Sequence, residues 1–282
     1  MSTRKKIIFA AVAVFAFFAV LEGSARILFN LSPDARWEYE QSHLISEGFP
    51  SLKDALEPDP VLFWRLRPNL SAVAMVGRVS EFELRFTLST DGDGHRLAPV
   101  PPDSEYTVLF LGDSCTLGIG VDDEQAFPAQ VQARLPDVRC INAGVPGYTA
   151  YQGRRLHEQL DIDPAPRVVV ITFGVNDDKP WDDRSDPEHG RLLADRRSGL
   201  LNHLRLVQCL GRVLPLGQPE SRGDESKQRP RLNEAEFDEE IRRLVRRCQE
   251  SGSRPILVVW PYRAQVYRPG ETWKQQVLRR IG

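Results

Sequence analysis

The sequence has almost no net charge, since 37 lysines and arginines stand against 39 aspartates and glutamates among its 282 residues. Internal repeats and low-complexity tracts are missing, because the 21 prolines and 20 glycines are scattered among apolar runs and turn-like places. Such a chain is neither basic enough nor patterned for binding nucleic acid. With 41% apolar residues, it is long enough for one α/β core and a smaller appendage.

Cysteine is scarce as well. The four cysteines are Cys115, Cys140, Cys209 and Cys248, and no two have the CxxC spacing that zinc sites use. We therefore expect no zinc site. An even number of cysteines in an exported chain permits disulfides. Cys140, at the end of an apolar run, and Cys248, on a helical stripe, fit small buried apolar residues equally well.

One long apolar run is present, and it lies at the N-terminus. Arg4-Lys5-Lys6 precedes an uncharged stretch from Ile7 to Leu21. We expect residues 1–31 to form a cytoplasmic basic tip and a transmembrane helix. Gly23-Ser24-Ala25 offers small residues to a signal peptidase, so a cleaved export signal stays open. In both cases the positive-inside bias places the rest of the chain outside the cytoplasm, in the periplasm or at the cell surface.

Residues 32–104 are rich in proline, aromatic and charged residues. Within them, Glu81 to Leu88 alternates between polar and apolar side chains, which predicts a half-buried strand. Asp91-Gly92-Asp93-Gly94 supplies a turn. We expect a linker and a small β-containing module here.

Residues 105–282 consist of short apolar runs separated by helical stretches, which is typical of βαβ units with a parallel sheet and helices on both faces. The predicted strands are Tyr106–Leu111, Val138–Ile141, Val168–Phe173 and Ile256–Trp260. A helix precedes the last of them, because Asn233 and Glu236 form a capping box and Gly252 ends the periodic pattern. Its apolar stripe is Phe237, Ile241, Leu244 and Cys248.

A long insertion, residues 178–231, separates the third and fourth predicted strands. It contains an apolar helical piece from Leu200 to Leu214 and a charged piece from Gly217 to Arg231. Insertions at the carboxyl edge of a parallel sheet often shape a substrate pocket. A plain surface excursion is the alternative for the charged piece.

The strongest local motif is Gly112-Asp113-Ser114, which follows the first apolar strand directly. It places a hydroxyl at the carboxyl end of a strand, where ligands bind in open α/β sheets. Ser114 would begin a helix, whose free NH groups favour developing negative charge. A plain strand-to-helix cap is the alternative interpretation of these three residues alone.

Two further turns follow predicted strands and can each supply a hydrogen-bond donor. The turn Asn142-Ala143-Gly144-Val145 can expose the NH of Gly144, and the turn Gly174-Val175-Asn176-Asp177 carries the amide of Asn176. Acyl transfer needs such donors where the tetrahedral oxyanion forms.

These three motifs resemble, in order and spacing, the conserved blocks of the SGNH (GDSL-like) hydrolase family, and the N-terminal anchor resembles its membrane-anchored bacterial branch. The resemblance implies a flavodoxin-like three-layer αβα fold and an extracytoplasmic serine esterase without a metal or organic cofactor. It also implies Ser114 as nucleophile, with Ser114, Gly144 and Asn176 forming the oxyanion hole. The substrate would be an ester-containing small molecule, glycan or lipid.

The sequence departs from the family pattern at the catalytic base, since no Asp-x-x-His block is found. The five histidines are His43, His95, His157, His189 and His203, and only His189 and His203 lie where the insertion could bring them over Ser114. No catalytic histidine or aspartate is therefore identified. We expect a fragment that lacks the last strand and is nearly inactive on aryl esters; a natural pseudoenzyme is the alternative.

Four functions stay open at this point, the last of them a structural scaffold. The first is ester hydrolysis, and the second is O-acyl transfer or deacetylation on cell-envelope glycans. The third is a catalytically inactive module that keeps the pocket to bind an acylated glycan. A purely structural scaffold would allow Ser114, Gly144 and Asn176 to be replaced freely.

Overall fold

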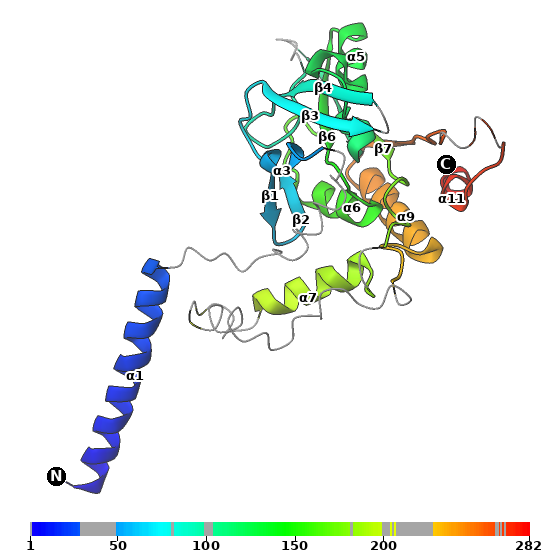
Figure 1. The fold of residues 1–282 in the computed structure, drawn as a ribbon. Coiled ribbons are helices and arrows are strands. Elements are labelled where there is room, and N and C mark those ends of the chain that lie inside the picture. The colour runs from blue at the N-terminus through cyan, green and yellow to red at the C-terminus, as the bar shows by residue number, and fades with distance from the viewer. Residues whose placement is uncertain are drawn as a thin grey trace.

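The computed structural model describes residues 2–28, 49–79, 82–98, 104–180, 183–198, 204, 206, 228–262, 265, 267 and 269–282 (Figure 1). His43, His203, Cys209 and the predicted helical piece from Leu200 to Leu214 fall wholly or mostly outside these residues, as does most of the charged piece that follows it.

The N-terminal apolar run forms a single helix, α1 (Thr3–Leu28). Its segment from Thr3 to Ile27 is long and apolar enough to cross a membrane. Length and composition of this kind fit either a membrane anchor or a signal sequence.

The predicted β-containing module consists of a short helix and two antiparallel hairpins. Its elements are α3 (Leu52–Ala55), β1 (Leu56–Asp59), β2 (Phe63–Leu66), β3 (Val73–Val79) and β4 (Phe82–Leu88). The strand predicted over residues 81–88 is confirmed as β4, with Phe86 and Leu88 buried, although Phe82 is 67% exposed. The sequence pattern did not predict β1, β2 or β3.

The core sheet is parallel, in the order β6-β5-β7-β8. Its strands are β5 (Tyr106–Gly112), β6 (Val138–Gly144), β7 (Val168–Thr172) and β8 (Arg254–Leu257). In chain order this is 2-1-3-4, which is the flavodoxin-like arrangement, so the predicted fold class is confirmed. The last strand begins two residues earlier than predicted, because its pairing with β7 starts at Arg254 opposite Val168.

Helices cover both faces of this sheet. They are α4 (Ser114–Leu117), the 3-10 turn η1 (Asp123–Gln125), α5 (Phe127–Arg134), α6 (Ala150–Gln159), α9 (Glu234–Glu250) and α11 (Trp273–Ile281), while α7 (Asp186–Ser198) packs against α6. Phe110 and Val170 pack with Phe127 of α5 on one face. The alternate residues Leu109 and Ile171 belong to the large core that holds α6, α9 and α11. The result is three layers, as expected for strands with period 2.

The predicted capping of α9 is confirmed. Asn233 accepts a hydrogen bond from the NH of Glu236, whose side chain accepts in return from the NH of Asn233. All four residues of the predicted apolar stripe are buried. Cys140 and Cys248 are buried free thiols, whereas Cys115 is an exposed free thiol.

The N-terminal module shares its core with the sheet instead of packing as a separate body. Trp64 and Phe63 of β2 lie in the same buried cluster as the β5 and β7 side chains. Arg96, which is buried, donates its guanidinium hydrogens to the carbonyls of Leu117, Gly118 and Val121. Arg96 therefore holds the N-terminal module against the segment that follows Gly112-Asp113-Ser114, the first turn of the candidate site.

The insertion between β7 and α9 starts and ends at one place. The NH of Leu232 donates to the carbonyl of Asp177, and the NH of Asp186 donates to the carbonyl of Arg231. An isolated bridge pairs Pro180 with Pro230. Both ends of the insertion are thus fixed beside the third turn of the candidate site.

Candidate active site

The first turn leads from β5 into α4. Asp113 caps the helix by accepting a hydrogen bond of 2.8 Å from the NH of Cys115, and Ser114, which begins α4, is partly exposed. A side chain at Gly112 would collide with the hydroxyls of Thr116 and Thr172, which are hydrogen-bonded to each other. Glycine is therefore required where the strand turns into the helix.

The second turn follows β6 and lies against α4. The NH of Gly144 donates to the side-chain oxygen of Asn142 at 3.1 Å. A side chain at Gly144 would collide with the backbone of Thr116 and Leu117. Gly144 therefore permits the close approach of this turn to α4, and its NH already has an acceptor in this structure. Its predicted place in an oxyanion hole stays a prediction.

Gly147, in the same turn, differs from Gly144. Its φ angle of 78° lies in the left-handed region that favours glycine. Among the described residues, its NH donates no hydrogen bond. The sequence analysis did not single out Gly147, although a glycine three residues after Gly144 is the signal that could have found it.

The third turn brings Asn176 to the other two. The Asn176 side chain is 2% exposed. Its Nδ2 atom lies 3.1 Å from the carbonyl oxygen of Tyr148 and 3.4 Å from Oδ2 of Asp113, the residue before Ser114. One amide thus spans all three turns, as expected when the carboxyl ends of neighbouring parallel strands meet at one edge.

Lys179 is a residue of this site that the sequence analysis missed. Its Nζ donates a 2.9 Å hydrogen bond to Oδ1 of Asn176, and its own NH donates to the Asn176 carbonyl. No sequence motif distinguishes Lys179 from the other charged residues of the insertion. Only the turn in three dimensions reveals that it faces the amide.

Two buried carboxyl groups lie behind the cluster. Burial raises the pKa of Asp113 to about 6, against the opposing hydrogen bonds from Cys115 and the charge of Lys179. Burial also raises the pKa of Asp177 to about 7, and the neighbouring Asp113 adds to this shift. Oδ1 of Asp177 accepts the NH of Ala150, whereas Oδ2 has no partner among the described residues. Cys115 is exposed as a residue, but desolvation of its sulfur and the neighbouring Asp113 charge raise the pKa of its thiol to about 12.

The C-terminal part of the chain covers the third turn. Tyr262 donates its hydroxyl to the carbonyl of Gly174 at 2.8 Å, and Nζ of Lys274 lies 2.7 Å from Oδ2 of Asp178. Lys274 is 4% exposed, so this ion pair is shielded from solvent on the lysine side. Burial raises the pKa of the Tyr262 phenol, which keeps the hydroxyl a donor.

The histidines that the structure describes make contacts with residues other than Ser114. His189 is buried on α7, with its ring against Phe63. His157 lies 3.9 Å from the Cys248 sulfur, near the end of α6 opposite to the turns. Among the described residues, no histidine is hydrogen-bonded to Ser114, so the structure gives no support to His189 as its base.

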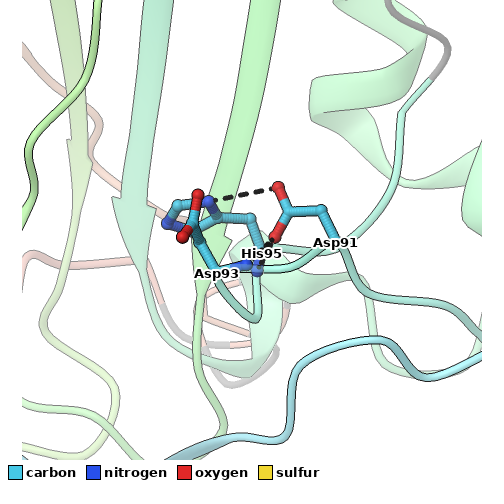
Figure 2. A group of neighbouring side chains, drawn as sticks. All are labelled: Asp91, Asp93 and His95. Atoms are coloured by element: carbon cyan, nitrogen blue, oxygen red, sulfur yellow. Dashed lines mark hydrogen bonds and ion pairs between the residues drawn. The ribbon is translucent and has the colours of Figure 1, made fainter.

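His95 lies in the turn that also carries Asp91 and Asp93. Figure 2 shows the His95 imidazole joined to the Asp91 carboxylate, with Nδ1 and Oδ2 3.3 Å apart. The ligand-type atoms of these three residues lie within 4.8 Å of one another. Oδ1 of Asp91 is already used by the NH groups of Asp93 and His95. These contacts shape a turn, and they are the reason that the predicted turn forms here.

Fold and site together define an α/β protein of flavodoxin-like strand order, with a serine and an amide at the carboxyl edge of its sheet. The model of the GDSL-like lipase/acylhydrolase family matches residues 110–281, more than half of the chain. The chain belongs to this family, and the resemblance to SGNH hydrolases is confirmed.

Individual relatives match the chain over a shorter stretch or at lower identity. Esterase TesA of Pseudomonas aeruginosa is 36% identical over 75 residues, which make up 25% of this chain and 37% of that protein. The chain thus spans little more than a third of the length of this curated relative. The crystal structure of TesA is 20% identical, with a TM-score of 0.36, and the match covers 62% of this chain and 69% of that one. The lipase/acylhydrolase from Enterococcus faecalis is 19% identical, with a TM-score of 0.36 and coverage of 63% and 71%.

Proposed function

We propose that this protein is a serine ester hydrolase that uses Ser114 as its nucleophile outside the cytoplasm. The observation that carries the proposal is the position of the Asn176 amide, which spans Asp113, beside the nucleophile, and Tyr148 of the second turn. Membership in a family of lipases and acylhydrolases supports ester bonds as the target.

In the proposed reaction, the Ser114 oxygen attacks the acyl carbonyl carbon and loses its proton to a general base. The carbonyl oxygen becomes an oxyanion, which the Ser114 NH and the Asn176 amide stabilise by donating hydrogen bonds. Collapse of the tetrahedral species expels the alcohol and leaves an acyl-serine. As it leaves, the alcohol takes up the proton that the base had accepted. Water then attacks the acyl carbon, with the same donors facing the second oxyanion, and the base accepts a proton from this water. The bond between Ser114 and the acyl group breaks, which releases the acid and returns a proton to Ser114.

The second turn is proposed to add one backbone donor. The sequence assigns this role to Gly144, whose NH would have to leave Asn142 to reach an oxyanion. Gly147 is the better candidate in the same turn, because its NH has no acceptor among the described residues and its backbone is held by Arg231 through the Gly147 carbonyl.

The location outside the cytoplasm rests on the N-terminus. Basic residues precede an exposed apolar helix that is long enough to span a bilayer. The positive-inside bias then leaves the α/β part on the far side of the membrane, attached to it when the helix is not cleaved.

A binding module without catalysis is the second candidate. It is favoured by one observation, namely that no histidine of the described part of the chain contacts Ser114. Such a module would keep the donors of the three turns to hold the acyl group of a glycan without cleaving it.

Covalent labelling separates the two functions. The detergent-solubilised protein is treated with a fluorophosphonate probe, and the labelled peptide is identified by mass spectrometry. An esterase is expected to carry the label on Ser114 and to lose it in Ser114→Ala, whereas Ser51→Ala, outside the site, keeps it. An unlabelled wild-type protein, or a label that survives Ser114→Ala, would contradict the proposal.

A further inference from the structure

We propose that Lys179 is a positioning residue that holds and polarises the Asn176 amide, so that its NH2 group faces the reacting carbonyl. The inference rests on the proposed function, since it assigns a role within the same site. The hydrogen bond from Nζ of Lys179 to Oδ1 of Asn176, at 2.9 Å, is its starting point.

The first argument concerns the orientation of the amide. The oxygen and nitrogen ends of a carboxamide have nearly the same shape, and only hydrogen bonding distinguishes them. A lysine ammonium can donate but not accept, so its contact with Asn176 selects Oδ1 on that side. The NH2 end is thereby directed to Tyr148 and Asp113, toward the nucleophile.

The second argument concerns burial. Asn176 is 2% exposed, so an Oδ1 atom without a donor would lose its hydration with no replacement. The Lys179 residue is exposed, but its Nζ atom donates a hydrogen bond to this buried oxygen. Its removal leaves Oδ1 with a hydrogen-bonding deficit inside the site, which loosens the rotation of the amide.

The third argument concerns charge. A cation on the oxygen end draws electron density away from the NH2 end and makes it a stronger donor. The same charge acts on Asp113, where burial raises the pKa and the Lys179 charge opposes that shift. Lys179 therefore offsets the negative charge of the carboxylate that competes with an oxyanion for the NH2 group.

The kinetic test uses Lys179→Met, which keeps the length of the side chain and removes its donor and charge, and Lys179→Arg, which keeps both. For the labelling of Ser114 by the fluorophosphonate probe, Lys179→Met is expected to lower the second-order rate constant about tenfold, because the amide stabilises the oxyanion that forms as the probe reacts. Lys179→Arg should retain most of the rate. Lys53→Met, on α3 of the N-terminal module, is the matched control and should equal the wild type.

A spectroscopic test does not depend on turnover. The sequence has six asparagines, so selective ¹⁵N labelling gives a simple side-chain amide spectrum, in which Asn176→Ala identifies the Asn176 pair. This pair is expected to shift and broaden in Lys179→Met and to return in Lys179→Arg.

Either of two results would overturn the inference: an Asn176 amide signal that Lys179→Met leaves unchanged, or a rate of Ser114 labelling that is the same in the Met and wild-type proteins. Failure of the proposed function is recognised separately, because the wild-type protein would then stay unlabelled or Ser114→Ala would keep the label.

Discussion

The second and third turns of the site are held in place by different forces. The second turn is fixed through its backbone: Trp64 donates its Nε1 hydrogen to the carbonyl of Pro146, and Arg231 donates to the carbonyl of Gly147. The backbone of the third turn is held as well, by Tyr262 on the Gly174 carbonyl. Its side chains are fixed by charged partners, namely Lys179 on Asn176 and Lys274 on Asp178. A backbone donor is positioned once its chain is positioned, whereas a side-chain donor needs polar partners of its own.

The second turn also depends on the N-terminal module. Besides the Trp64 contact, Tyr148 donates its hydroxyl to the carbonyl of Trp64, and Gln152 donates to that of Leu62. These bonds join residues 82 to 90 positions apart in the sequence. The module is thus part of the wall behind the site, and damage to it should reach the second turn before the third.

The largest expected effect is the loss of the buried charge that holds the second turn. Arg231 is 1% exposed and forms two hydrogen bonds of 2.9 Å with Asp186. Arg231→Met leaves Asp186 buried without its partner, and we expect a loss of about 3–5 kcal/mol in the free energy of unfolding. Denaturant unfolding measures it. Arg85→Met, whose ion pair with Glu83 is exposed on both sides, should change stability by no more than about 0.5 kcal/mol; equal effects would refute the role of Arg231.

A slightly smaller effect is expected from a substitution in the third turn. It should lower the reaction rate rather than the stability. Asn176→Ala removes the side-chain donor, and the rate at which the fluorophosphonate labels Ser114 should fall by about 100-fold to 1,000-fold. Labelling kinetics with a parallel melting curve separate this loss from unfolding. A decrease of less than about threefold in a folded variant would exclude Asn176 from the oxyanion hole.

A moderate effect on the second turn is expected from Trp64→Phe. The substitution keeps a ring but removes the donor to Pro146, so the free energy of unfolding should fall by about 1–3 kcal/mol. Trp260→Phe is the matched control, because the Trp260 Nε1 atom has no hydrogen-bond partner in the described part of the chain. If both variants lose the same stability, the hydrogen bond from Trp64 contributes nothing beyond the indole volume.

The smallest effect concerns pH. Unfolded aspartate titrates near 3.8, whereas Asp177 in the folded protein has its pKa raised to about 7 by burial and by Asp113. Between these values the folded protein binds more protons than the unfolded chain, so stability falls as pH rises. Asp177→Asn cannot ionise there, and its melting temperature relative to wild type should be higher at pH 8 than at pH 5. A difference that does not change with pH would contradict the raised pKa.

The sheet was predictable because its signals are local and repeated. Apolar runs such as Val168–Phe173 mark buried parallel strands, and the capping box at Asn233 marks the start of α9. The hairpins of the N-terminal module could not be predicted from the sequence, apart from the strand β4. Their strands are short, and their burial is decided by contacts such as Trp64 with Tyr148, far away in the sequence.

The site was predictable to the level of its three turns. The motifs locate Ser114 and Asn176, because each follows a strand that the sequence reveals. They do not tell which NH of the second turn is free, since this depends on the side chain of Asn142. Nor do they reveal Lys179, whose contact with Asn176 arises from the local fold of the insertion.

The structure of the protein with a phosphonate bound to Ser114 is the most direct test of the convergence of the turns. The phosphonyl oxygen stands in for the oxyanion of the tetrahedral intermediate. It is expected to lie about 2.7–3.1 Å from Nδ2 of Asn176, with the NH of Ser114 as a second donor. A phosphonyl oxygen that points away from Asn176, with the amide still bonded to Asp113 and Tyr148 alone, would contradict the proposed site.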